Sequence, residues 1–120
     1  VVLEAERGQF HGISDCLLTV GGGSEPVSGV RVRGSPGAVL RMHREDYANA
    51  ALYTKSEHRH ALQLVNVRQA LVEGLRIELS GGDGIYADRV QDTVIRSVDM
   101  ADNYRCVTGQ IPGLCAPRDD

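Results

Sequence analysis

The sequence of 120 residues is long enough for one domain, and its 42% hydrophobic content is sufficient for a folded core and excludes a disordered chain. The formal net charge is −3 and no segment gathers Lys and Arg away from acids, which argues against nucleic acid as a partner. No apolar run approaches the roughly 20 residues of a membrane-spanning helix, so a membrane is not an expected partner either.

Short β-type runs follow one another along most of the chain, and Gly, Pro, Asn or Asp separates most of them. They cover residues 17–20, 27–32, 38–42, 61–67, 71–77, 84–87 and 93–100. The segment from Arg44 to His60 departs from this rhythm because it is polar, and Asp46 could cap a short helix there that ends at Leu52 or Tyr53. We interpret this segment as an insertion.

A period of about 23 residues relates the later runs to one another, which is the range expected of repeat proteins. The tripeptide from Leu75 to Ile77 matches the tripeptide from Val98 to Met100 at this offset, and the same shift carries Leu62 onto Ile85. Within each repeating unit the two apolar runs have one constant separation, which gives the pairs Leu17/Val30, Leu62/Leu75 and Ile85/Val98. These pairs indicate three units in phase.

The interval from Leu17 to Leu62 is about twice this period, and it has two explanations. The excess is either an additional coil or a loop of about 22 residues within one coil, and the polar character of residues 44–60 favours the loop. Short β-branched strands with this period predict a solenoid of stacked parallel coils, which bury apolar residues in columns. A β-sandwich or α+β domain with coincidental spacing is the alternative.

Several segments resemble bacterial right-handed parallel β-helix repeat proteins of the pectate-lyase-like superfamily. They are Val30–Gly34, Gly37–Met42, Arg44–Tyr47, Arg59–Ala61, Val72–Ile77, Ser80–Tyr86 and Asp102–Arg105. The resemblance covers most of the chain from Val1 to Arg105. It implies an all-β, right-handed parallel β-helix fragment of about four coils over residues 1–105, with residues 44–60 as the one long loop insertion.

The resemblance also carries expectations about function and location. It implies a polysaccharide lyase or a glycoside hydrolase-like protein, outside the cell or in the periplasm. The chain opens on Val1 with neither Met nor a leader, so any export signal should lie outside this segment. After Arg105, residues 106–120 form an irregular tail where such proteins usually continue into another coil. Fold does not fix activity, so a non-catalytic β-helix that binds glycan or forms a structural scaffold is the alternative.

The register set by this period predicts a column of groups that could cleave a sugar. Asp15, His60 and Asp83 each precede an in-phase position by the same short step, so successive coils should place them about 4.8 Å apart. Asp83 could form an acid–base pair with Asp15, or with Glu45 or Asp46 from the loop, because paired carboxylates divide these roles in glycoside cleavage. His60 could act as a base or hold a substrate carboxylate.

Residues flanking this column are candidates for substrate binding. Arg59 and Arg105 could bind uronate carboxylates in a bidentate way, and Tyr86 and Tyr104 could stack on sugar rings. Structural roles are the alternatives. Asp83 is a natural turn former, His60 could be solvated or bonded to a turn, Glu45 and Asp46 could start a short helix, and Asn103 should hydrogen-bond a turn backbone.

The residues themselves indicate no cofactor and no metal site, although calcium takes part in some lyases of the resembled class. Cys16, Cys106 and Cys115 are an odd set without CxxC spacing, which argues against a zinc site and a full disulfide framework. Pro112 and Pro117 in the tail cannot donate to a β ladder. We therefore expect a polysaccharide or oligosaccharide partner, and self-association of the chain through uncapped ends.

Overall fold

The computed structural model describes residues 2–4, 16–42, 60–80, 82–101 and 103. The described chain is all-β, with nine strands in two sheets. The strands are β1 (Val2–Glu4), β2 (Leu18–Gly21), β3 (Val27–Ser28), β4 (Arg31–Arg33), β5 (Val39–Arg41), β6 (Leu62–Arg68), β7 (Leu71–Glu78), β8 (Ile85–Gln91) and β9 (Val94–Ala101).

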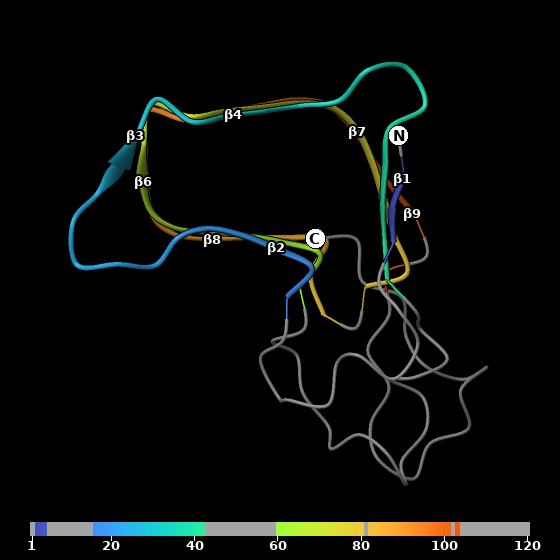
Figure 1. Ribbon diagram of the computed structural model, residues 1–120, viewed down its shortest axis with the longest axis horizontal. Helices are drawn as coiled ribbons and strands as arrows, with labels where there is room; N and C mark the ends of the chain where they lie inside the picture. The colour runs from blue at the N-terminus through green and yellow to red at the C-terminus, as the bar shows by residue number, and fades with distance from the viewer. Residues whose placement is uncertain (1, 5–15, 43–59, 81, 102, 104–120) are drawn as a thin grey trace, which may run out of the picture.

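Each sheet is organised around one central strand. In sheet A, β7 pairs with β4, β5 and β9, and β1 pairs with β5. In sheet B, β6 pairs with β2, β3 and β8. All of these pairings are parallel, so the chain runs through sheet B and then sheet A and returns to the side on which it started. We call each such circuit through both sheets a turn, and successive turns lie over one another in Figure 1.

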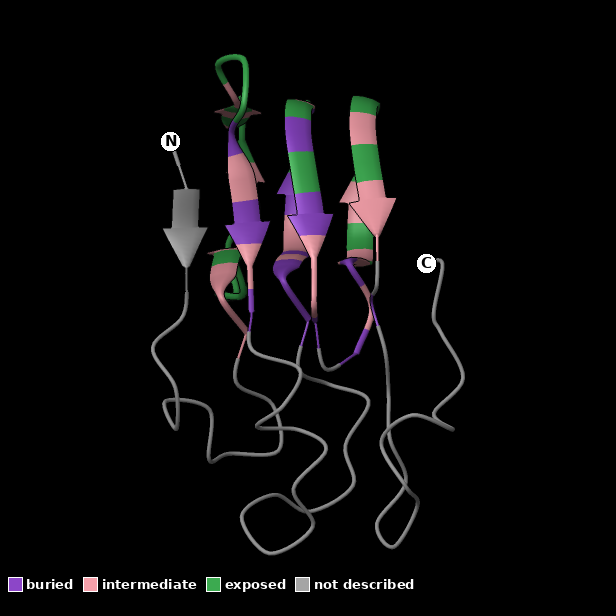
Figure 2. Ribbon diagram, turned by 90° about the vertical axis from the view of Figure 1, so that its right-hand side faces the viewer, coloured by how far each residue is buried: buried purple, intermediate pink, exposed green. Residues whose placement is uncertain are grey.

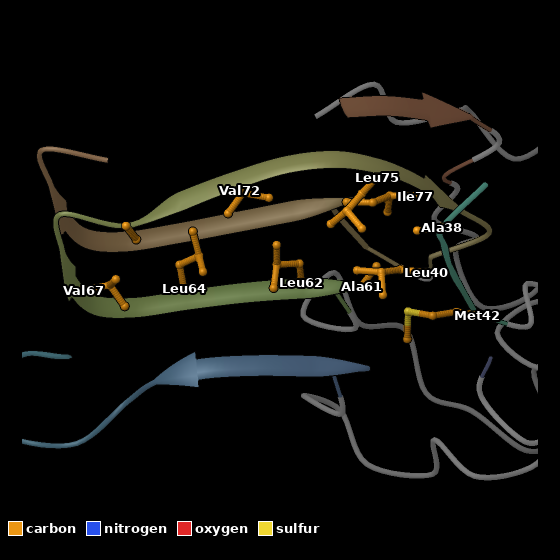
Figure 3. Packing of buried hydrophobic residues seen from close by; sticks show 11 residues of the cluster. Ala38, Leu40, Met42, Ala61, Leu62, Leu64, Val67, Val72, Leu75 and Ile77 are labelled. Atoms are coloured by element: carbon orange, nitrogen blue, oxygen red, sulfur yellow. The ribbon is translucent and has the colours of Figure 1, made fainter. Parts of the chain in front are cut away.

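Apolar columns fill the space that each turn encloses. Leu62, Leu64 and Val67 of β6 face Val72 and Leu75 of β7 across the interior (Figure 3). The remaining buried hydrophobic residues of this core are Ala38, Leu40, Met42, Ala61, Ala70 and Ile77. Because the β6–β7 turn is covered on both sides by neighbouring strands, it contributes most of the fully buried side chains.

Left-handed backbone conformations mark the corners at which each turn changes direction. They occur in register on successive turns, at Asn66 and Arg89, at Gln69 and Asp92, and at Gly74 and Ser97, with φ between 50° and 74°. Glycine, Asn and Asp tolerate this region better than β-branched residues, which the strands between the corners use instead, and Gln69, Arg89 and Ser97 are the other polar residues that adopt it. The corners therefore set where each straight segment ends.

The predicted fold class, a right-handed parallel β-helix fragment of about four coils with one long loop insertion, is wrong. The described residues contain two uninterrupted turns, β6–β7 and β8–β9, one turn broken into the four short strands β2–β5, and the single strand β1. The body is compact, with a radius of gyration of 14.2 Å against about 14 Å for a compact chain of this length. Its principal extents are 41, 34 and 23 Å, and a compact all-β body with short strands in two sheets stands in place of the right-handed four-coil solenoid.

The predicted columns are correct for the later turns and wrong for the first. Leu62 pairs with Ile85 and Leu75 with Val98, both at the predicted period. However, Leu18 rather than Leu17 lies opposite Leu62, and Arg76 donates its N–H to Ala38, so Ala38 rather than Val30 precedes Leu75 in its column. The expected helix from Asp46 lies outside the described residues.

Two small corner loops explain this error of phase. Residues 22–26 stand where the next turn has Asn66 alone, and residues 34–38 stand where it has only Gly74 and Leu75. The offset between paired residues consequently falls from 44 at Leu18 to 40 at Val27 and 37 at Val39. Part of the excess length of the first turn is thus spread over two corners.

Two glycines allow the first described turn to lie against the second. A Cβ on Gly74 would lie 2.7 Å from the carbonyl oxygen of Gly34, and a Cβ on Gly34 would overlap the carbonyl oxygen of Gly74. Gly74 also has a φ of 74°, which other residues adopt only with strain. Close approach of the two backbones at this corner therefore requires glycine in both turns.

We expect Gly34→Ala to lower the free energy of unfolding by about 1–3 kcal/mol, because the added methyl group meets backbone atoms that cannot move aside. Chemical denaturation followed by circular dichroism measures this change. Gly23→Ala is the matched control, since a Cβ there has no atom within 4 Å. Equal stability of the two variants would contradict the close packing of this corner.

Candidate functional site

The structure describes three of the nine predicted site residues. His60, Asp83 and Tyr86 lie where the chain enters β6 and β8. The other six lie outside the described residues: Asp15, Glu45, Asp46, Arg59, Tyr104 and Arg105. The carboxylate pairs predicted for Asp83 therefore stay predictions.

His60 and Asp83 meet on successive turns, as the predicted register requires. The backbone N–H of Asp83 donates to Nδ1 of His60 at 3.1 Å, and the Asp83 Oδ2 lies 3.5 Å from the same nitrogen. The His60 ring stacks on Tyr86 with centroids 4.6 Å apart and an interplanar angle of 6°. Because Nδ1 accepts a hydrogen bond, the proton of the neutral ring is on Nε2.

Burial limits what this histidine can do chemically. Its side chain is 2% exposed, one ring face is covered by Tyr86, and one nitrogen is occupied by a backbone donor. A general base must come within hydrogen-bond reach of a substrate proton, which this position does not offer. The same stacking leaves Tyr86 with one face covered by His60. We therefore regard the His60–Asp83–Tyr86 cluster as a structural joint between turns.

The described register before β2 differs from the predicted one by one position. Continuing the pairing of Leu18 with Leu62 back by two positions sets Cys16 against His60, whereas Asp15 lies outside the described residues. The hydrogen bond from the N–H of Leu17 to the carbonyl oxygen of His60 agrees with this register. The shift by one position has the same cause as the misplaced apolar column, because the length of the first turn is not a multiple of the period.

A second polar pair follows β7 at the same corner of the turn. The N–H of Ser80 donates to Oδ1 of Asn103 at 3.1 Å, and the Ser80 hydroxyl donates to the carbonyl oxygen of Gly82 at 2.8 Å. Both side chains are buried. The prediction that Asn103 hydrogen-bonds a turn backbone is confirmed, and the pair joins two turns at the same spacing as His60 and Asp83.

The outward side of sheet A carries a cluster that the sequence analysis missed. Glu73, on the central strand β7, lies in register with Arg33 of β4 and Arg96 of β9. Nε of Arg33 donates to Oε1 at 2.8 Å, and Nε of Arg96 donates to Oε2 at 2.7 Å. One carboxylate thus holds two guanidinium groups, whose side chains are 62% and 60% exposed.

A similar cluster lies further along β7. Glu78 accepts hydrogen bonds from Nε of Arg41 at Oε1 and from Nε of Arg76 at Oε2. Hydrogen bonds from Arg76 and Arg41 lower the pKa of Glu78, and the hydrogen bond from Arg96, with the charges of both its arginines, lowers the pKa of Glu73. Each glutamate is therefore ionised at neutral pH and each cluster has a net charge of +1.

The two clusters flank the Gly74 corner, where the surface is hollowed. A depression of about 340 Å³ is lined there by Gly37, Ala38, Val39, Gly74, Leu75, Arg76, Ser97 and Asp99. The positions without side chains at Gly37 and Gly74 leave this space open. In β4, β5, β7 and β9 together, five arginines face three acidic residues, so this part of an acidic protein has an excess of positive charge.

The sequence contained only part of the signal for these clusters. Glu73 and Arg96 are separated by one period and could have been paired by the offset that related Leu62 to Ile85. The separations of Arg33 from Glu73 and of Arg41 from Glu78 are different, and neither follows from that period. The corner loops of the first turn conceal these partners.

Comparison with known proteins finds no family model, curated protein or solved structure that matches this chain. The resemblance to the pectate-lyase-like superfamily therefore stays a prediction. Within the described residues, no three His, Cys, Asp or Glu side chains are grouped so that they could hold a metal ion. The same part of the chain contains no helix long and apolar enough to cross a membrane.

We expect His60→Phe to lower the free energy of unfolding by about 1–3 kcal/mol, because phenylalanine preserves a ring beside Tyr86 but leaves the Asp83 N–H without its acceptor. Thermal or urea unfolding measures the loss. Tyr86→Phe, which keeps the stacked ring, should cost much less. A His60→Phe protein as stable as the wild type would show that this hydrogen bond contributes nothing.

We expect Glu78→Gln to reduce stability at pH 7 and to flatten its acid dependence. Because the pKa of Glu78 is lower in the folded protein, its contribution is present above the ordinary glutamate pKa and is lost as the pH falls through the folded value. Melting temperatures of variant and wild type should therefore converge as the pH falls below the folded pKa of Glu78. The exposed Glu25→Gln serves as the control, and a difference between Glu78→Gln and wild type that stays constant throughout the acid range would contradict the assignment.

Proposed function

We propose that the chain is a non-catalytic binding module for an acidic polysaccharide, with the outward side of sheet A as its binding surface. The arrangement of Arg33 and Arg96 on one carboxylate supports this proposal most directly. Each uses Nε to bond Glu73, which holds the guanidinium group in place while the side chains stay 62% and 60% exposed. Guanidinium groups have the geometry to bind carboxylates.

The spacing of the arginines suits an extended ligand. Arg33 and Arg96 lie two turns apart across β7, which corresponds to about 9.6 Å in a parallel stack. The cluster around Glu78 provides a further pair beyond the hollow at Gly74. A polymer with regularly repeated carboxylates could contact both clusters, whereas a small anion would use one.

The overall charge favours uronate polymers over more densely charged ones. A net charge of −3 opposes long-range attraction of polyphosphate chains, and Asp99 beside Arg76 reduces the local positive field. Uronic acids have one carboxylate per sugar and hydroxyl groups that can bond to exposed backbone and Ser97. The non-catalytic form of the proposal follows from the burial of His60, the one described histidine of the predicted acid–base column.

The test is affinity electrophoresis in gels that contain polygalacturonate, with dextran as the neutral polymer. We expect the wild type to be retarded by polygalacturonate alone, and salt to weaken the effect. Arg33→Gln and Arg96→Gln should each weaken binding by about 10-fold or more, because each removes charge-assisted hydrogen bonds of about 1.5–3 kcal/mol.

Arg89→Gln is the matched control, since Arg89 is equally exposed and also paired with an acid, Asp88, but lies on sheet B. Circular dichroism should show that all three variants are folded. Equal losses in Arg89→Gln and Arg96→Gln would indicate unspecific charge attraction and contradict the proposed surface. Absence of retardation of the wild type would contradict the proposed ligand class.

A further inference from the structure

The last described turn has apolar residues that the preceding turn buries. Val72 of β7 is fully buried, whereas Ile95, its partner on β9, is 44% exposed and the neighbouring Val94 is 50% exposed. Figure 2 shows this change from β7, in which buried residues alternate with exposed ones, to β9, in which every residue is exposed or half-buried. Among the described residues no strand pairs with the far edge of β9, and such an edge is a template for a further strand.

The backbone phase of β9 identifies which groups face this edge. Val94 donates its N–H to Ala70 on the β7 side, so the N–H and carbonyl of Ile95 point to the far edge. On β7, Arg76 donates toward Ala38 on the side away from β9, so by alternation Met100, which lies opposite Ile77, also presents its backbone groups to the far edge. Both arms of β9 therefore offer donors and acceptors there.

The charged and apolar residues of β9 match those of a second copy of β9 that runs antiparallel to it with the bend at the same place. The bend lies at Ser97, where φ is 53°. An antiparallel copy centred between Ser97 and Val98 places Arg96 opposite Asp99, both of which are outward. It places Ile95 opposite Met100, whose partners on β7 are both buried in the core. Charges, apolar side chains and hydrogen-bonding groups thus match in one register.

We propose that two copies of this chain pair through β9 in an antiparallel manner, across a two-fold axis next to Ser97. The opposite charges of Arg96 and Asp99 select this register, because shifting it by two positions would place Val94 against Asp99 and Arg96 against Ser97. The pairing covers Ile95 and gives β9 a second neighbouring strand. The axis repeats the Arg96–Asp99 contact twice, so the interface is isologous and stops at two copies.

Sedimentation velocity over a concentration series, without any polysaccharide, tests this proposal. The wild type should form a dimer of about twice the 13.0 kDa chain mass. Asp99→Arg and Arg96→Asp should each raise the dimer dissociation constant by at least about 10-fold, because each introduces two like-charge contacts. The double variant Arg96→Asp with Asp99→Arg reverses both charges and should restore the dimer.

Glu25→Arg supplies the same change of charge as Asp99→Arg, in the exposed loop between β2 and β3 at the opposite end of the stack. It should leave the dimer intact. A wild type that is monomeric at all concentrations, a double variant that stays monomeric while folded by circular dichroism, or a dimer lost in Glu25→Arg would each overturn the proposal. These outcomes are measured without polysaccharide, whereas polysaccharide binding is also measured on Arg33, which takes no part in the β9 pairing.

Discussion

Parallel pairing between successive turns constrains every other feature of this protein. The strands β6 and β7 hydrogen-bond to a turn on either side, so a side chain that is inward in one turn lies above an inward side chain in the next. The buried columns, the corners at Gly74 and Ser97 and the Arg–Glu–Arg clusters all follow from this coincidence. A shift of one position would exchange the core with the charged surface.

How much of this could be predicted depended on whether two turns have equal length. Leu62 with Ile85 and Leu75 with Val98 were predictable because β6–β7 and β8–β9 have the same length. The first turn was not, because the corner loops at 22–26 and 34–38 change the phase without changing the alternation of apolar residues within a strand. Sequence periodicity reports spacing, and corner loops alter spacing while leaving the pairing intact.

The same reasoning separates the two candidate sites. His60 and Asp83 were expected to meet and do meet, but an acid and an imidazole at equal spacing also describe a structural joint, and burial decides between the two meanings. The arginine clusters, in contrast, were not predicted from the sequence but are present in the structure. Their exposed side chains have no periodic signature across the first turn, so only the pairing of Arg33 with Glu73 and of Arg41 with Glu78 brings them together.

The connections between sheet A and the following turn differ greatly in length, with residues 5–17, 42–61 and 79–84 each joining a strand of sheet A to one of sheet B. The strands that flank them end and begin at the same corner of the molecule (Figure 1). Because the strands before and after each connection are fixed by their neighbours, its length has little effect on the register of the stack. Between its buried ends Met42 and His60, the longest connection can therefore accept insertions and deletions during evolution, and it is the place to graft a foreign peptide without disturbing the core.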